Sequence, residues 1–147
     1  MNTNNEEGIQ VGVQRIYIKD ISFEVPNPIK TFKEAYKPEL KVELRSSNSD
    51  IEPHLFETVL EITITAENNG EVAFIAEVEQ AGIFSVKGLS GERLSHFLGT
   101  YCLSILFPYA REAIDNLAIK GSFPPVSLAP INFEALYASR QGNPQES

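Results

Sequence analysis

Cysteine, tryptophan and positive charge are scarce in this sequence of 147 residues. It contains one cysteine and no tryptophan, and 12 lysine and arginine residues stand against 20 aspartate and glutamate residues, for a formal net charge of −8. A single cysteine excludes an internal disulfide and a cysteine cluster for zinc. Because the chain is acidic and has no basic block, we do not expect nucleic acid or an anionic membrane as its main partner.

Long apolar runs are also missing from the sequence. It has no run of about 18 apolar residues, so we expect no membrane-spanning helix and no direct membrane insertion. The start MNTNNEEG (1–8) is polar and acidic, so we expect it to be mobile and not to act as a signal peptide. Residues 141–147 are expected to form a polar C-terminal tail. The length predicts a single domain, 1–147, and these features together predict a cytoplasmic protein.

Signatures of catalysis and of cofactor binding are absent as well. The sequence has neither a glycine-rich phosphate loop nor a dinucleotide-binding fingerprint. His54 and His96 are the two histidines, and they are too far apart in the sequence to give a metal-ligand spacing. Cys102 falls on an apolar helical stripe, where we expect a small core residue. We therefore predict no catalytic residue, no metal and no cofactor, and a protein that is not an enzyme.

Four segments alternate between apolar and polar residues with the period of two that is typical of strands. These segments are 10–25, 39–45, 54–67 and 71–84. The stretch SSNSD (46–50) is expected to be a turn, and NNG (68–70) predicts a hairpin because Asn and Gly tolerate positive φ. Residues 27–38 are expected to form a connector, although it carries Phe32 and Tyr36.

The second half of the chain has a helical period of about 3.6. This period predicts a helix over residues 94–106. Pro108 either kinks that helix or begins the next one, which ends at Gly121. Asn132 caps a short final helix, 133–140. Strands followed by helices indicate the α+β class, with a four-stranded antiparallel sheet and helices packed on one face.

Alternation assigns the strand residues to the two faces of this sheet. The face toward the helices is predicted to hold Tyr17, Ile21, Phe23, Leu40, Val42, Leu44, Phe56, Leu60, Ile62, Ile64, Phe74, Ala76 and Val78. The opposite face is predicted to hold eight acids, Asp20, Glu24, Glu43, Glu57, Glu61, Glu67, Glu77 and Glu79, with Ile16, Ile18, Val59 and Ile75 among them. Such a face either keeps the protein soluble or receives a basic partner, and the pattern leaves both interpretations open.

Apolar residues exceed the needs of one small core in two places. The helix over 94–106 carries Leu103 off its main stripe, which indicates either an oligomer interface or a second face covered by the C-terminal segment. The residues that we expect at an interface are Leu94, Leu98, Tyr101, Cys102 and Ile105. Aromatic residues in the connectors either line an open groove or pack on the core. Without any resemblance to a known family, the sequence also fits an α+β domain that binds a small apolar ligand, or a structural oligomer that binds a basic partner.

Several stretches resemble one known family over nearly the whole chain. They are QRIY (14–17), KDISFEVPN (19–27), GIFSVKG (82–88), ILFPYARE (105–112) and LAPINFEALY (128–137). The stretches occur in the order and with the spacing found in SecB, the bacterial protein-export chaperone family. The resemblance implies an ATP-independent chaperone that holds unfolded precursor proteins, forms a homotetramer (a dimer of dimers) and delivers its clients to the SecA ATPase.

The resemblance also implies roles for individual residues. The SecA-binding residues would be Asp20, Glu24, Ile75 and Glu77, on the predicted acidic face. The client-binding groove would contain Phe32, Tyr36, Ile83, Phe84 and Phe123. Ile75 stands where Leu is usual in the family, Tyr36 where Trp is common and Ala81 where Gly is common. Family tails also contact SecA, but this tail is short and has few apolar residues, so the sequence leaves open whether it makes that secondary contact.

Overall fold

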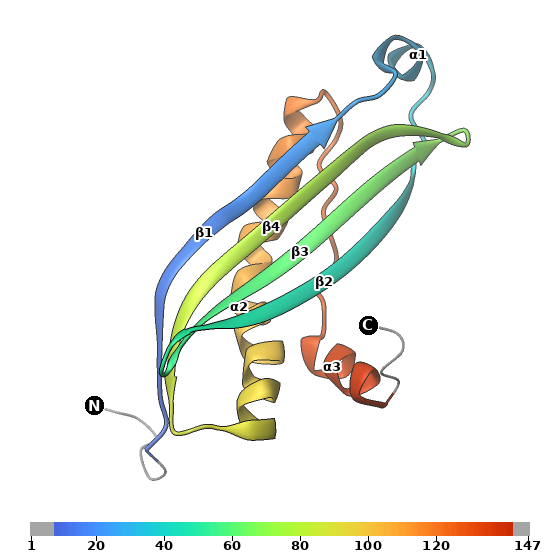
Figure 1. Ribbon diagram of the computed structural model, residues 1–147. Helices are drawn as coiled ribbons and strands as arrows, with labels where there is room; N and C mark the ends of the chain where they lie inside the picture. Colours follow the sequence, from blue (N-terminus) through green and yellow to red (C-terminus); the bar gives the residue numbers. More distant parts are fainter. Residues whose placement is uncertain (1–7, 143–147) are drawn as a thin grey trace.

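The computed structural model describes residues 8–142 as a four-stranded sheet with helices on one side (Figure 1). The elements are β1 (Gln10–Glu24), α1 (Pro28–Lys33), β2 (Glu39–Glu52), β3 (Leu55–Asn68), β4 (Glu71–Lys87), α2 (Gly91–Lys120) and α3 (Phe133–Gly142). The predicted mobile N-terminus (1–8) and the polar tail (141–147) lie almost entirely outside the described residues. The structure confirms the predicted α+β class.

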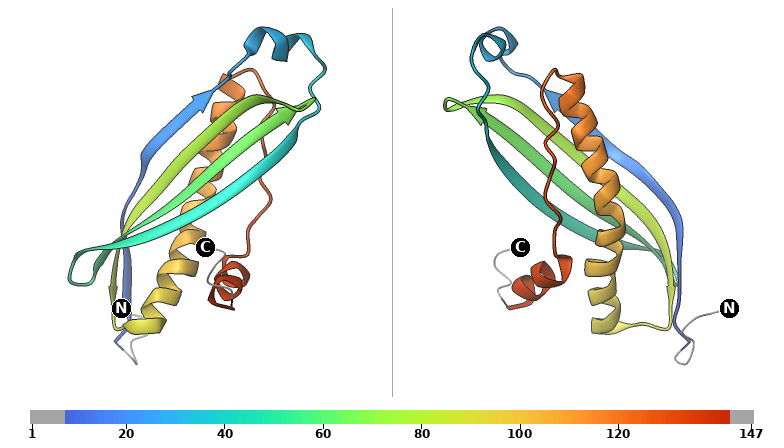
Figure 2. Two further views of the ribbon diagram at one scale, coloured as in Figure 1. Left: turned by 45° about the vertical axis from the view of Figure 1, so that its right-hand side comes forward. Right: turned by 180° about the vertical axis from the view of Figure 1, so that it is seen from behind.

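The sheet is antiparallel throughout, in the order β1-β4-β3-β2. The long helix α2 crosses one face, and the extended segment after it returns along the same side toward α3, so the other face of the sheet is left open (Figure 2). The buried core lies between α2 and the two central strands. Its largest fully buried side chains are Phe74, Phe84, Leu60, Ile62, Ile64, Leu106, Ile114, Val78, Val86, Thr58 and Cys102.

Two turns decide the lengths of the central strands. Asn69 and Gly70 have φ values of 56° and 79°, so the predicted hairpin between β3 and β4 is confirmed. The turn predicted at 46–50 is wrong, because β2 continues to Glu52 and reverses at Pro53 and His54. The serine and asparagine residues in 46–50 have low strand propensity, but pairing with β3 supplies hydrogen-bond partners for their backbone.

Strand β1 departs from simple alternation. Its register with β4 shifts between Ile18 and Asp20, which marks a bulge at Lys19. The extra residue moves the side chains just before it to the opposite faces of the sheet. Tyr17 therefore pairs with Ala81 on the open face, while Ile18 lies on the helix side. The prediction was therefore wrong for Tyr17, and for Ile16 and Ile18, which had been assigned to the acidic face.

Helix α2 does not cover the whole width of the sheet. The side chains of Leu40 and Val42 on β2 and of Ile21 on β1 face the helix side as predicted, yet each is more than 40% exposed. Both strands are at the edges of the sheet, where α2 makes little or no contact. Apolar margins are therefore left open on the helix side of this single subunit.

Helix α2 is continuous from Gly91 to Lys120, with Pro108 inside it. Proline removes one backbone donor, but Phe107 and Ala110 are buried on either side of it, and this packing maintains the helix. Gly121 follows the helix as predicted, although its φ is −89°. Glycine is required there by close packing, since a Cβ would lie 2.5 Å from the ring of Phe23.

Two shorter helices flank this scaffold. The connector 27–38 contains α1, which the sequence interpretation missed because the helix is only six residues long, but which begins at a proline, as many helices do. The cap predicted for the last helix is confirmed, since the backbone N–H of Ala135 donates to Asn132 Oδ1 at 3.0 Å.

Candidate functional site

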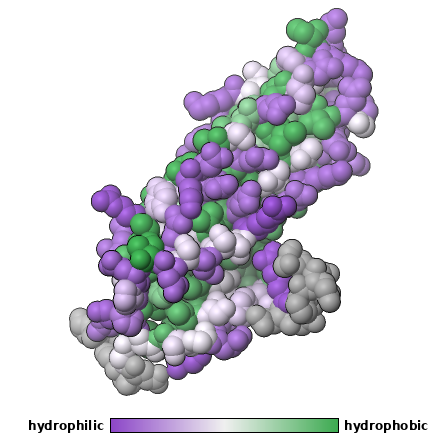
Figure 3. Space-filling model, viewed as in Figure 1, coloured by the Kyte–Doolittle hydropathy of each residue, from purple (hydrophilic) through white to green (hydrophobic). Residues whose placement is uncertain are grey.

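The open face of the sheet carries the predicted acids. Within it, Asp20 is directly opposite Glu79, Glu24 is opposite Ile75, and Ser22 is opposite Glu77. The four residues expected to bind SecA therefore lie together on the adjacent strands β1 and β4. Figure 3 shows hydrophilic side chains spread over this face, with smaller apolar areas between them. The structure thus brings an apolar side chain, Ile75, into a field of carboxylates.

Not every carboxylate on this face is equally available. Tyr17 Oη donates to Glu57 Oε2, and Lys19 Nζ lies 2.9 Å from Glu57 Oε1. These two hydrogen bonds lower the pKa of Glu57, and the bond from Tyr17 has the larger effect. Partial burial, followed by the neighbouring carboxylate, raises the pKa of Tyr17 to about 12. Two donors therefore hold Glu57 in its charged form, whereas the side chain of Glu77 is exposed.

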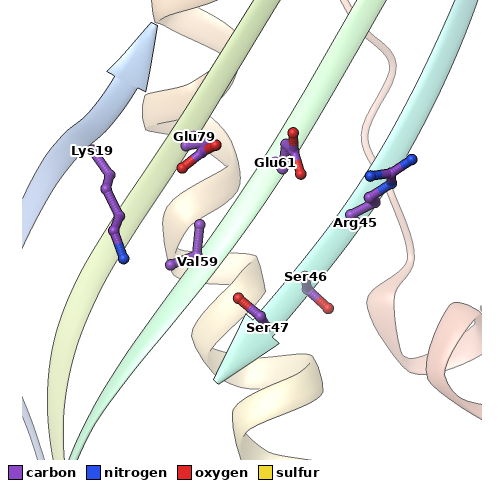
Figure 4. Close-up of a pocket in the computed structure, with 7 residues that line it drawn as sticks. All are labelled: Lys19, Arg45, Ser46, Ser47, Val59, Glu61 and Glu79. Atoms are coloured by element: carbon purple, nitrogen blue, oxygen red, sulfur yellow. The ribbon is translucent and has the colours of Figure 1, made fainter. Parts of the chain in front are cut away.

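A shallow hollow of about 250 Å³ lies farther along the open face, with Val59 and hydroxyl groups between charged side chains (Figure 4). Glu61 and Glu79 are directly opposite each other on β3 and β4, and Arg45 is opposite Glu61 on β2. Adjacent like charges are unfavourable, so Arg45 offsets part of this repulsion. Arg45 and Lys19 are therefore positive charges at the border of the acidic part of this face.

An aromatic cleft lies at the end of the molecule that carries α1. The ring centroids of Phe32 and Tyr36 lie 5.4 and 5.2 Å from that of Phe123, and Phe74 lies 4.8 Å beneath Phe123. Phe123 is only 6% exposed, whereas Phe32 is 52% exposed. The cleft has a volume of about 360 Å³. We name these three residues, Phe32, Tyr36 and Phe123, the aromatic cleft; burial raises the pKa of the Tyr36 hydroxyl within it.

Asn68 holds the connector that forms this cleft. Its Oδ1 accepts from the backbone N–H of Lys37 at 2.7 Å, and its Nδ2 donates to the carbonyl of Ala35 at 3.0 Å. These bonds bracket Tyr36, and they satisfy a side chain that is almost completely buried. The sequence interpretation treated Asn68 only as part of the hairpin and missed this positioning role. An asparagine that ends a strand was the only available signal.

Two residues expected in the groove lie elsewhere. Ile83 is on the open face, opposite Glu57, and is half-buried. Phe84, its neighbour on β4, faces α2 and is completely buried in the core. Successive strand residues point to opposite faces, so the two cannot line one surface. Neither contributes to the aromatic cleft, and Phe84 offers no exposed surface in this subunit.

The residues expected at an oligomer interface divide in the same way. Leu98 and Cys102 are buried within the subunit, and burial raises the pKa of the Cys102 thiol to about 12. Leu94 and Ile105 are half-buried. Tyr101 is exposed, with its ring centroid 4.8 Å from that of Phe97. Of the five expected residues, only Leu94, Tyr101 and Ile105 therefore present surface to a second subunit.

The C-terminal segment covers the second apolar face of α2, which was one of the two interpretations left open. Leu103 is 3% exposed, and Phe133 at the start of α3 is buried with its ring centroid 6.0 Å from that of Phe107. A groove of about 370 Å³ remains between β1 and α2, lined by apolar side chains that include Ile18 and Tyr109. On the helix side of the sheet, apolar surface therefore stays uncovered in this groove and along the edge strands.

The histidines form no metal site in the structure. His54 is in the turn after β2, with a φ of 68°, and His96 Nε2 lies 2.9 Å from Glu134 Oε1. Over residues 8–142, no group of three histidine, cysteine or acidic side chains is arranged to hold a metal ion. Within the same residues, no helix is both long and apolar enough to cross a membrane.

Comparison with known proteins identifies the family. The family model described as "Preprotein translocase subunit SecB" matches residues 4–144. The chain is 49% identical over 144 residues to the protein-export protein SecB of Pseudomonas savastanoi pv. phaseolicola, covering 98% of this chain and 89% of the relative. It is 46% identical over 145 residues to that of Stutzerimonas stutzeri, covering 99% of this chain and 88% of the relative.

A solved structure shows the same fold. The Mycobacterium tuberculosis SecB-like chaperone Rv1957, solved in complex with a ChAD peptide of the HigA1 antitoxin, superposes with a TM-score of 0.70. The match covers 82% of this chain and 90% of that chain at 20% identity. Taken with the family match over nearly the full length, these findings confirm the predicted resemblance: the chain belongs to the SecB family of protein-export chaperones.

Proposed function

We propose that this chain works as a homotetramer, a dimer of dimers, that holds unfolded precursor proteins without ATP or any catalytic activity and delivers them to SecA in the cytoplasm. The observation that carries the proposal is the aromatic cleft, an apolar hollow with one half-exposed ring, on a chain of the SecB family. The solved SecB-like chaperone is in complex with a peptide, which supports polypeptide binding by this fold.

The aromatic cleft suits weak binding of many sequences. A client side chain that enters it contacts Phe32 and Tyr36, and Phe123 forms a rigid base. Burial of about 400 Å² of apolar surface at ~25 cal/mol/Å² gives roughly 10 kcal/mol before association and ordering costs are subtracted. Each cleft alone is therefore weak. Several clefts on one tetramer that engage a single long chain raise the overall affinity by about 10²–10⁴-fold.

The open sheet face would receive SecA through charge complementarity. Asp20, Glu24 and Glu77 would attract basic side chains, and Ile75 would supply an apolar contact at the centre. This surface is on the face of the sheet opposite to α2. A client at the aromatic cleft would therefore bind a different surface of the subunit from SecA on the open sheet face.

Uncovered apolar surface on the helix side supports the tetramer. The groove between β1 and α2 contains Ile18, Ile21 and Tyr109, whose side chains are exposed in the single subunit. Gln80 at its floor is 3% exposed, and its Oε1 has no hydrogen-bond partner among residues 8–142. A second subunit that covers this groove would bury the apolar side chains and could supply the missing donor.

Dilution of a denatured polypeptide into buffer that contains this protein tests the proposal. We expect the protein to suppress aggregation in proportion to its concentration, with no nucleotide present. Native mass spectrometry of the same sample is expected to show four chains, alone and with one client. Aggregation that proceeds as in buffer alone, together with a single-subunit mass, would overturn the proposed function.

A further inference from the structure

The short helix α1 carries Phe32, yet little of the subunit holds this helix in place. None of its residues is buried, and Ile29 is 71% exposed. A helix of this length is not stable by itself, and the side chain of Asn27 makes no capping hydrogen bond at its start. Helix α1 also makes little contact with any other helix or strand of residues 8–142. The position of Phe32 over the aromatic cleft therefore depends on a small number of side-chain contacts.

The tip of the β3–β4 hairpin lies beside α1 at one end of the sheet (Figure 1). Lys30 Nζ is 2.7 Å from Glu71 Oε2, and Asn69 Nδ2 donates a hydrogen bond to Glu34 Oε1 at 3.2 Å. Asn68 holds the part of the connector that follows Glu34. The hairpin therefore contacts the connector at successive points along its length.

This hairpin tip is a firm support. Asn68 and Glu71 are directly opposite each other in the sheet, and a tight turn joins them. Strand β4 continues from Glu71 to Phe74, whose ring centroid lies 4.8 Å from that of Phe123 at the base of the cleft. The hairpin tip and the base of the aromatic cleft are therefore joined through one strand, and a side chain bound to the tip keeps its place relative to the cleft.

We propose that two residues of the hairpin tip, Glu71 and Asn69, are positioning residues for client binding, because their contacts hold α1 in place and keep Phe32 where a client side chain enters the aromatic cleft. We name their contacts with Lys30 and Glu34 the latch. The inference rests on the proposed function, since the site is that of the client. A site that is ordered beforehand binds more tightly, because no loop has to be ordered during binding. The side chains of the ion pair are 49% and 52% exposed, so salt screens this part of the latch.

Removal of the ion pair tests the latch. The variants are Lys30→Gln and Glu71→Gln, and the matched control is Lys33→Gln, which removes a positive charge from the same helix outside the latch and the cleft. The probe is a short peptide with one phenylalanine, no charged group and an uncharged dye, and fluorescence anisotropy gives its dissociation constant. An exposed ion pair shifts an equilibrium by up to about fivefold, so we expect the first two variants to bind the peptide about two- to fivefold more weakly than the parent. Lys33→Gln should bind it as the parent does.

Two comparisons separate the latch from a general loss of stability. The double variant Lys30→Gln, Glu71→Gln should bind the peptide no more weakly than either single variant, because both changes break the same contact. A rise from about 0.01 M to about 1 M salt should weaken binding to the parent by a similar factor, although the peptide is neutral. The same rise should not weaken binding to the double variant, because salt does not weaken the apolar contact itself.

A tryptophan reporter gives a readout that needs no client. The sequence contains no tryptophan, so Phe32→Trp introduces a single one on α1. In this background Glu71→Gln should increase the quenching of the tryptophan by acrylamide, because the ring spends less time against Phe123. Lys33→Gln should leave the quenching unchanged. Quenching that Glu71→Gln does not alter would mean that α1 keeps its position without the ion pair, which would contradict the latch.

The outcomes distinguish the latch from the proposed function. Equal affinities of Lys30→Gln, Glu71→Gln and Lys33→Gln for the peptide, together with no effect of salt on the parent, would overturn the latch and leave client holding intact. Failure of the parent protein to bind the peptide or any unfolded polypeptide would overturn the proposed function, and the latch with it.

Discussion

Replacing Phe32 by alanine tests directly whether the aromatic cleft binds clients. A phenylalanine side chain buries about 150–250 Å² when it is covered, and 52% of Phe32 is exposed in the free subunit. A client therefore covers about 100 Å² of this ring, which at ~25 cal/mol/Å² corresponds to about 2.5 kcal/mol. Since 1.4 kcal/mol is a factor of ten, Phe32→Ala is expected to weaken binding by about 10-fold to 60-fold, the upper value applying to complete burial.

The assay must report on one cleft rather than on the whole assembly. A short labelled apolar peptide that spans a single cleft removes the contribution of multivalency, and fluorescence anisotropy gives its dissociation constant. The matched control is Ile29→Ala, which removes an exposed apolar side chain from the same helix, α1, outside the cleft. Equal affinities of the Phe32 and Ile29 variants would refute the assignment of the cleft. Native mass spectrometry of both variants verifies that the oligomer is unchanged.

Three further predictions concern the acidic face and the packing. Lysine substitutions on the open face are expected to weaken SecA binding at low salt by at least about 100-fold while client holding persists. The substitutions are Asp20→Lys, Glu24→Lys and Glu77→Lys. Tyr17→Phe removes a hydrogen bond that lowers the pKa of Glu57 and is therefore expected to be less stable than the parent protein in urea titrations at pH 7. This loss of stability should become smaller below a pH of about 4.5, as Glu57 becomes protonated. Gly121→Ala puts a methyl group against Phe23 and should lower the free energy of unfolding by about 1–3 kcal/mol in the same assay.

Each of these predictions has a control or an outcome that contradicts it. Glu92→Lys makes the charge change of one of these substitutions on α2, outside the open face, and should leave SecA binding intact. If SecA binds the triple lysine variant normally at low salt, the acidic face is not its docking site. A stability deficit of Tyr17→Phe that is the same at pH 3 and pH 7 would mean that the bond to Glu57 has no effect on its protonation. An unaltered unfolding free energy in Gly121→Ala would show that the Phe23 ring moves at no cost.

The central strands and the positions of the acids could be predicted from the sequence, because a period of two maps directly onto the two faces of a sheet. The same logic failed on β1, where the bulge at Lys19 reverses the facing of Tyr17 and Ile18. No residue type marks such a bulge, since it is produced by pairing with β4. The length of β2 was missed for a similar reason, because its polar end is held by its partner strand.

The candidate site was only partly predictable. The residues expected to bind SecA do lie together on one face, and three of the five expected groove residues meet at Phe123. Phe84 and Cys102 are buried in the subunit's own core instead. Periodicity identifies an apolar side chain that needs to be covered. It does not tell whether the cover is the same subunit, a second subunit or a client.

The measurement that tests the central claim most directly is the stoichiometry of aggregation suppression without nucleotide. A denatured precursor is diluted into increasing amounts of this protein, and light scattering is followed while native mass spectrometry reports the complexes. The account predicts that scattering falls to its minimum near one tetramer per client and that the client travels with four chains. Scattering that is unaffected at any ratio, or suppressed only when ATP is added, would contradict it.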